Sequence, residues 1–187
     1  MTVDQFVSEH LTSPRPGARL GYLAQHQLLA QVPALRRDIL VPDYCYTGLQ
    51  VRCRISTHTL YVCCMYLHHD HQDEDPEIHV WIGPGGTVSP AHTDKKHNVL
   101  CQVAGHKYVA VFAAEESARL YPDPAPMLHN TSRVDLDAPD LEQFPGVRQL
   151  RGQHTVLGPG EMLYIPPLVW HYVRSLEQSF SVSFWWE

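Results

Sequence analysis

Three side chains that lie far apart in the sequence have the types and local context of metal ligands. His92 and Asp94 form an H-x-D pair. In an extended segment, positions i and i+2 point to the same face, so the imidazole and the carboxylate can converge on one point. His171, which follows a second apolar stretch, supplies another imidazole. Two neutral imidazoles and one carboxylate leave three adjacent coordination positions open, which is the arrangement of a non-haem Fe(II) oxygenase.

Each of these residues also has an ordinary structural explanation when it is taken alone. An isolated His on a strand is usually a hydrogen-bonded core or surface residue, and Asp94 precedes Lys95 and Lys96, as a turn residue in a charged loop would. That explanation weakens because all three residues lie at junctions between turns and strands, where a barrel points side chains inward. Lys107 begins an apolar strand, and an inward Lys needs a counter-charge, which a ligand carboxylate would supply.

The elements that must position these residues are short strands. From residue 79 onward, apolar runs bounded by turn residues predict strands at 79–83, 98–103, 107–112, 162–165, 170–173 and 180–186. The segment 83–86 predicts a turn, and Ala104-Gly105-His106 predicts a hairpin between its flanking strands. This spacing indicates a mainly β fold, a small antiparallel barrel or jelly roll with short flanking helices.

Three regions depart from the strand pattern. Residues 1–45 are expected to form short helical pieces and loops, and the proline-rich residues 113–150 a long, mostly irregular excursion. Residues 46–78 combine an apolar run with a His/Asp/Glu stretch, and we interpret them as an atypical insertion into one domain that spans 1–187.

The insertion contains several residues that could bind a metal, namely His58, Cys63, Cys64, His68, His69 and His71. Their spacing matches no established zinc pattern, so we predict no second metal site there.

Composition excludes several classes of protein. With 44% apolar and 18% charged residues, the 187-residue chain is no wholly disordered protein and suits one globular domain. The net charge of −6 argues against direct nucleic-acid binding through bulk charge. We expect no membrane span and no signal peptide. Five irregularly spaced cysteines favour a reducing compartment, the nucleus or the cytoplasm.

The chain resembles a known family along two long stretches. The likeness rests on Trp81–Asp94, on Asn98 and on Gly105–Tyr108, with support from 21–27, 128–132, 139–145 and 180–186. Together these motifs closely resemble the JmjC-domain 2-oxoglutarate oxygenases. The likeness covers roughly residues 1–45 and 79–187. It begins almost at Met1, whereas the family domain has further strands before this point, so we expect a domain shortened at its N-terminus.

The resemblance implies a double-stranded β-helix, a relative of the jelly roll and cupin folds, that holds Fe(II) and 2-oxoglutarate. Three residues match the family's iron ligands and catalytic centre: His92, Asp94 and His171. Four match positions that bind the cosubstrate, the first of them at its distal carboxylate: Lys107, Tyr22, Ser89 and Asn98. Two match aromatic positions at the border of the active site, where we expect contact with substrate: Trp81 and Trp185.

The activity implied by the resemblance is oxidation of a protein or peptide substrate with O2 and 2-oxoglutarate, releasing succinate and CO2. We favour hydroxylation of an arginine side chain, and the alternative is demethylation of a methyl-lysine, as on a histone in chromatin. The shortened N-terminus keeps open a catalytically impaired interaction module. A cupin-type metal enzyme that works without 2-oxoglutarate is disfavoured, because Lys107, Tyr22 and Asn98 would have no role in it.

Overall fold

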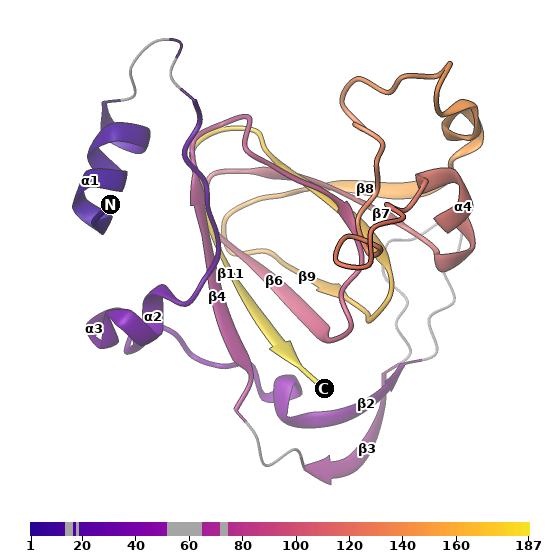
Figure 1. Ribbon diagram of the computed structural model, residues 1–187. Helices are drawn as coiled ribbons and strands as arrows, with labels where there is room; N and C mark the ends of the chain where they lie inside the picture. The colour runs from indigo at the N-terminus through magenta and orange to yellow at the C-terminus, as the bar shows by residue number, and fades with distance from the viewer. Residues whose placement is uncertain (14–16, 18, 52–64, 72–74) are drawn as a thin grey trace.

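The computed structural model describes residues 1–13, 17, 19–51, 65–71 and 75–187. Two antiparallel sheets face each other and form a flattened barrel, with short helices on its outside (Figure 1). This arrangement confirms the predicted mainly β fold of the jelly-roll type with short flanking helices.

The two sheets draw their strands from distant parts of the chain. The larger sheet has the order β1 (Leu23–His26), β4 (Glu77–Gly83), β11 (Ser179–Trp186), β6 (His97–Ala104) and β9 (Met162–Ile165). The smaller sheet has the order β5 (Val88–His92), β10 (Trp170–Ser175), β7 (Lys107–Phe112) and β8 (Gly152–Leu157). The last two strands of the chain therefore lie in different sheets, and each is flanked by strands formed much earlier in the sequence.

The predicted hairpin at Ala104-Gly105-His106 is wrong. β6 pairs with β11 and β9, whereas β7 pairs with β10 and β8, so the chain crosses from one sheet to the other at this point. Gly105 has a φ of +69°, which favours glycine, and a Cβ there would collide with the carbonyl of Gln178. Gln102 Nε2 donates to the carbonyls of Ala104 at 2.7 Å and Gly105 at 3.1 Å, which holds the corner.

Short helices account for the flanking regions. Two of them precede β1, namely α1 (Val3–Phe6) and η1 (Val7–Thr12), and three lie between β1 and β2 (Thr47–Val51), namely α2 (Leu28–Gln31), α3 (Pro33–Arg36) and η2 (Asp43–Tyr46). The excursion at 113–150 carries η3 (Ala114–Glu116), α4 (Ser117–Leu120) and η4 (Pro145–Gln149). In the part of the chain that the structure describes, no helix has the length and apolar character to cross a membrane.

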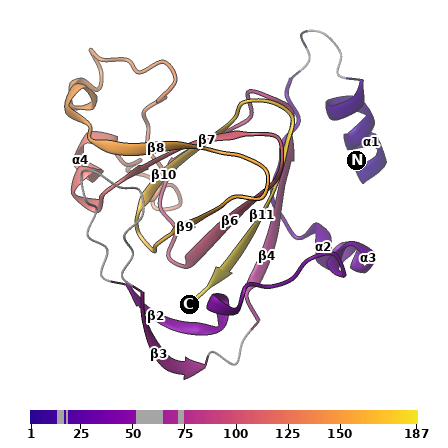
Figure 2. The same ribbon diagram turned by 180° about the vertical axis from the view of Figure 1, so that it is seen from behind.

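The expected insertion at 46–78 is described in part. β2 (Thr47–Val51) and β3 (Met65–His71) pair with each other in a separate two-stranded sheet, which lies below the barrel in Figure 1 and Figure 2. Residues 52–64 and 72–74 lie outside the described residues. The interpretation of this region as an insertion stays a prediction, as does the lack of a metal site at its His and Cys residues.

The larger sheet separates two environments because side chains alternate along its strands. On the outer face, residues of α2, η2 and three strands form an apolar cluster: Leu28, Leu29, Cys45, Val80, Val99, Val182, Phe184 and Trp186. Between the sheets, a second cluster supports the cavity described below: Leu100, Val109, Leu157, Leu163, Ile165 and Val173.

Candidate metal centre

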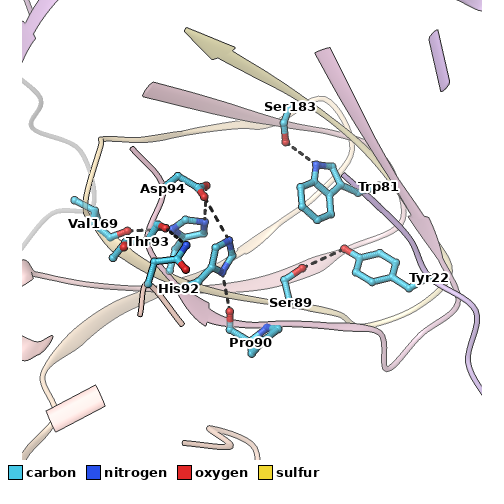
Figure 3. Close-up of polar contacts among 11 residues, drawn as sticks. Tyr22, Trp81, Ser89, Pro90, His92, Thr93, Asp94, Val169 and Ser183 are labelled. Carbon is cyan, nitrogen blue, oxygen red and sulfur yellow. Dashed lines mark hydrogen bonds and ion pairs between the residues drawn. The ribbon is translucent and has the colours of Figure 1, made fainter. Parts of the chain in front are cut away.

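His92, Asp94 and His171 lie together between the sheets, with candidate ligand atoms all within 4.8 Å of one another. Figure 3 labels His92 and Asp94 of this group. Asp94 Oδ1 is 3.9 Å from His92 Nε2, and Asp94 Oδ2 is 3.5 Å from His171 Nε2. The two imidazole centroids are 4.2 Å apart. Within the described residues, this is the one group of three or more His, Cys, Asp or Glu side chains close enough to share a metal ion.

Backbone carbonyls orient both imidazoles. His92 Nδ1 donates to the Pro90 carbonyl at 2.7 Å, and His171 Nδ1 donates to the Val169 carbonyl at 3.1 Å. Because a carbonyl only accepts, the proton lies on Nδ1 and each Nε2 presents its lone pair toward Asp94. This is the tautomer that a metal-binding imidazole needs.

The protonation states suit metal binding as well. Burial, followed by the neighbouring His171, lowers the pKa of His92 to about 4, so its ring is neutral at pH 7. Burial alone would raise the pKa of Asp94, but interactions with the neighbouring His171 and His92 lower that pKa overall. The site therefore presents a neutral imidazole and a carboxylate without any need for a proton to leave.

Contacts from two distant loops hold the backbone of the H-x-D pair. β5 ends at His92, so Asp94 lies just beyond the strand and not within the extended segment that we predicted. The Leu168 amide donates to the Asp94 carbonyl at 2.7 Å. Asn130 accepts from the Thr93 amide at 2.9 Å through its carbonyl and donates through Nδ2 to the Thr93 carbonyl at 2.8 Å. Asn130 was not among the predicted site residues, and its sole signal in the sequence was its place in the segment 128–132.

An irregularity in β5 brings a further residue to the site. In the pairing with β10, His92 lies opposite His171 and Ser89 lies opposite Val173, with a register shift between them. A shift of this kind lets residues three positions apart share one face, although regular alternation would separate them. Ser89 and His92 consequently both line the cavity.

The cavity also receives a buried lysine. Lys107 is 1% exposed, and its Nζ donates to the Tyr22 hydroxyl at 3.5 Å. The Tyr22 hydroxyl in turn lies 3.5 Å from Ser89 Oγ. Burial lowers the pKa of Lys107 to about 8. Across the described part of the chain, no carboxylate lies within ion-pair distance of this ammonium. Asn98 Oδ1 is buried there without a hydrogen-bond partner among the described residues.

Aromatic side chains form the wall opposite the candidate ligands. Trp81 Nε1 donates to Ser183 Oγ at 2.8 Å, and the Trp81 ring lies 6.1 Å from that of Tyr22. Figure 3 shows Trp81 and Tyr22 across the opening from His92 and Asp94. Trp185 lines the same cavity. Ser183, which the sequence analysis missed, fixes the indole of Trp81.

The structure thus brings all nine predicted site residues to one cavity: Tyr22, Trp81, Ser89, His92, Asp94, Asn98, Lys107, His171 and Trp185. Their individual roles stay predictions. The donor set fits non-haem Fe(II), because two imidazole nitrogens and a carboxylate converge on one side. The unpaired ammonium of Lys107 fits a ligand that carries a carboxylate at its far end.

Fold and site together define a jelly-roll protein with a candidate centre of two histidines and one carboxylate. The chain belongs to the cupin-like domain family, whose model matches residues 1–187. It is 41% identical over 186 residues to lysine-specific demethylase 8 of Xenopus tropicalis, which covers 100% of this chain and 37% of the relative. It is 42% identical over 176 residues to Jumonji C domain-containing protein 5 of Drosophila melanogaster, which covers 92% of this chain and 38% of the relative.

A plant relative is similar at the same level. Lysine-specific demethylase JMJ30 of Arabidopsis thaliana is 40% identical over 186 residues, covering 100% of this chain and 38% of the relative. The chain therefore spans less than two fifths of the length of each of these three relatives. The resemblance to JmjC-domain proteins that the motifs indicated is confirmed.

Proposed function

We propose that this chain is an Fe(II)- and 2-oxoglutarate-dependent protein oxygenase. The observation that carries the proposal is a single cavity lined by a His92–Asp94–His171 ligand set and by the buried Lys107, which has no acidic partner among the described residues. A buried ammonium without a counter-charge is costly, so its presence beside a metal-ligand set favours an anionic cosubstrate.

Each side chain has a defined task in this proposal. His92, Asp94 and His171 hold the metal, which with 2-oxoglutarate and O2 supplies the oxidant for a substrate C–H bond. Lys107 pairs with the distal carboxylate of 2-oxoglutarate, and the Tyr22 and Ser89 hydroxyls donate hydrogen bonds to the same end. The reactive end of the cosubstrate is thereby fixed at the metal.

Our proposed substrate is an arginine side chain in a protein or peptide. The flat indoles of Trp81 and Trp185 line the cavity, and a guanidinium stacks well on such faces. A methylated ammonium binds aromatic faces too, and two of the relatives are named lysine-specific demethylases. Methyl-lysine demethylation is therefore the second candidate. A nuclear or cytoplasmic location, expected from cysteine usage and from the family likeness, stays a prediction.

The first experiment asks whether the chain consumes 2-oxoglutarate. Purified protein with 2-oxoglutarate, Fe(II), ascorbate and O2 should form succinate, and His171→Ala should reduce its formation to the background rate. His106→Ala is the matched control, because His106 lies at the corner opposite the metal centre and should leave the rate unchanged. Folded, metal-loaded protein that forms no succinate would contradict the proposal and favour the impaired interaction module.

The second experiment separates the two substrates. Peptides that differ only in carrying arginine or trimethyl-lysine at the central position are incubated with the protein and weighed by mass spectrometry. Arginine hydroxylation adds 16 mass units, whereas removal of one methyl group subtracts 14. If only a loss of 14 mass units were found, methyl-lysine demethylation would replace arginine hydroxylation as the proposed activity, and the oxygenase proposal would stand.

A further inference from the structure

The two tryptophans that line the cavity are held in different ways. Trp81 is fixed by the hydrogen bond from its Nε1 to Ser183 Oγ. Trp185 Nε1 is buried and has no hydrogen-bond partner among the described residues. Its ring packs instead against His79, with centroids 4.9 Å apart and planes inclined by 57°. The orientation of Trp185 therefore depends on a ring contact and not on a hydrogen bond.

His79 belongs to the inner face of the larger sheet. It precedes Trp81 by two residues on β4 and lies opposite Ser183 on β11, so it shares the face that borders the cavity. The residue is only 4% exposed. Its Nδ1 is buried without a partner within the described residues. The function proposed above gives no task to this imidazole.

Charged groups lie beyond the other edge of His79. His79 Nε2 is 3.8 Å from Glu77 Oε2, and Glu77 Oε1 is 3.1 Å from Lys96 Nζ. Lys96 Nζ also lies 2.8 Å from Glu187 Oε1, which anchors it. Glu77 thus contacts Lys96 and lies close to His79, and His79 in turn packs on the ring of Trp185.

We propose that His79 is a positioning residue for the protein substrate, acting through the ring of Trp185. This inference rests on the proposed function, in which Trp185 faces the substrate side chain. His79 sets the angle of the Trp185 ring, and that ring sets where the substrate's target carbon lies. His79 is not a metal ligand and does not line the cavity, so its loss should spare the metal and 2-oxoglutarate.

The first test reads the Trp185 ring directly. Fluorescence of Trp185 is obtained by subtracting the spectrum of the matching Trp185→Phe protein. In His79→Ala, acrylamide quenching of this signal should rise about twofold. His79→Phe, which keeps a ring at the contact, should return the quenching to the wild-type level. His97→Ala is the matched control, because His97 stacks on Trp186 with centroids 5.3 Å apart on the outer face of the sheet.

The second test measures kinetics with the acetylated and amidated peptide Gly-Gly-Arg-Gly-Gly. His79→Ala should raise the apparent KM for the peptide about tenfold, while 2-oxoglutarate consumption without peptide and the KM for 2-oxoglutarate stay within twofold. His79→Phe should recover most of the loss, and His97→Ala should show none.

The outcomes separate this inference from the proposed function. An unchanged Trp185 signal in folded His79→Ala, or a lowered Tm with unchanged kinetic constants, would assign His79 a merely structural role and overturn the inference. Wild-type protein that consumes no 2-oxoglutarate would reject the proposed function, and the fluorescence measurement would still decide whether His79 positions the Trp185 ring.

Discussion

The space between the sheets has two ends that are similarly buried and similarly rich in polar groups. At one end, Ser181 Oγ donates to Gln102 Oε1 at 2.7 Å, and Gln102 Nε2 donates to two carbonyls. At the other end, Asn98 Oδ1, His79 Nδ1 and Trp185 Nε1 are buried without partners among the described residues. Because buried polar atoms are normally paired, the unpaired end marks where a ligand belongs, and the paired end serves the fold.

The largest effect should come from the unpaired end. Asp94→Ala removes the carboxylate from the candidate metal centre, so Mn(II) affinity, measured by electron paramagnetic resonance titration, should fall by at least about 100-fold. Retention of Mn(II) affinity would show that the metal centre is wrongly assigned.

The paired end should respond in the opposite way. Gln102→Leu keeps the side-chain volume but leaves Ser181 Oγ and two carbonyls without their partner. The free energy of unfolding, measured with urea, should therefore fall by about 3 kcal/mol. The KM for 2-oxoglutarate should be unchanged in the folded protein. A large change in this KM with full stability would mean that the two ends are not functionally distinct.

Substitution of Lys107 should change protein stability and ligand affinity in opposite directions, so it tests the comparison at a single residue. Lys107→Met removes the unpaired ammonium but keeps much of its volume, so the protein without cosubstrate should become more stable toward urea. Affinity for 2-oxoglutarate, measured by calorimetry with Mn(II), should fall about 10- to 100-fold, because charge-assisted hydrogen bonds contribute about 1.5–3 kcal/mol. The exposed Arg148 gives the control, since Arg148→Met should alter neither quantity.

The smallest effect is a dependence on pH. The pKa of Lys107 is about 8, below its ordinary value, so its amine becomes neutral as the pH rises through 8. Binding of a dicarboxylate above that pH must take up a proton, and the Kd for 2-oxoglutarate should rise about tenfold between pH 7 and pH 9. Lys107→Met should show no such rise, and an equal rise in both proteins would remove Lys107 as its cause.

The same lysine should make protein stability depend on pH in the opposite direction, because binding of 2-oxoglutarate weakens as the pH rises whereas the protein without cosubstrate becomes more stable. Without cosubstrate, the unfolded chain binds more protons at this residue than the folded chain between pH 8 and its ordinary pKa of 10.5. The contribution of Lys107 to the free energy of unfolding should therefore increase as the pH rises through this range.

Sequence reasoning recovered the strands and the composition of the site better than it recovered connections. Strands such as β10 and β11 were predictable because their apolar runs end at turn residues, and Lys107 was conspicuous at the start of such a run. The hairpin predicted at Gly105 was wrong because a short glycine-containing connection suits a hairpin as well as a crossing between sheets. Which of the two forms depends on pairing with β10 and β11, and those strands lie far along the chain.

The fine geometry of the candidate metal centre could be predicted less well. Alternation alone would place Ser89 and His92 on opposite faces, and only the register shift against β10 brings them together. The support of Thr93 by Asn130 depends on how the irregular excursion folds back, which no local pattern specifies. His79 carried no signal, because a histidine two residues before a tryptophan has no meaning until both rings are placed against β11.

The crossing of the chain between sheets has a consequence for how the protein is made. Tyr22, which immediately precedes β1, and Trp185 on β11 both line the cavity. Most strands of the two sheets pair with strands that are distant in sequence. Such topologies fold slowly, because long loops must close before the contacts that reward them can form. During synthesis, the candidate metal centre lacks His171 until β10 has left the ribosome, so the three candidate ligands can come together only late in synthesis.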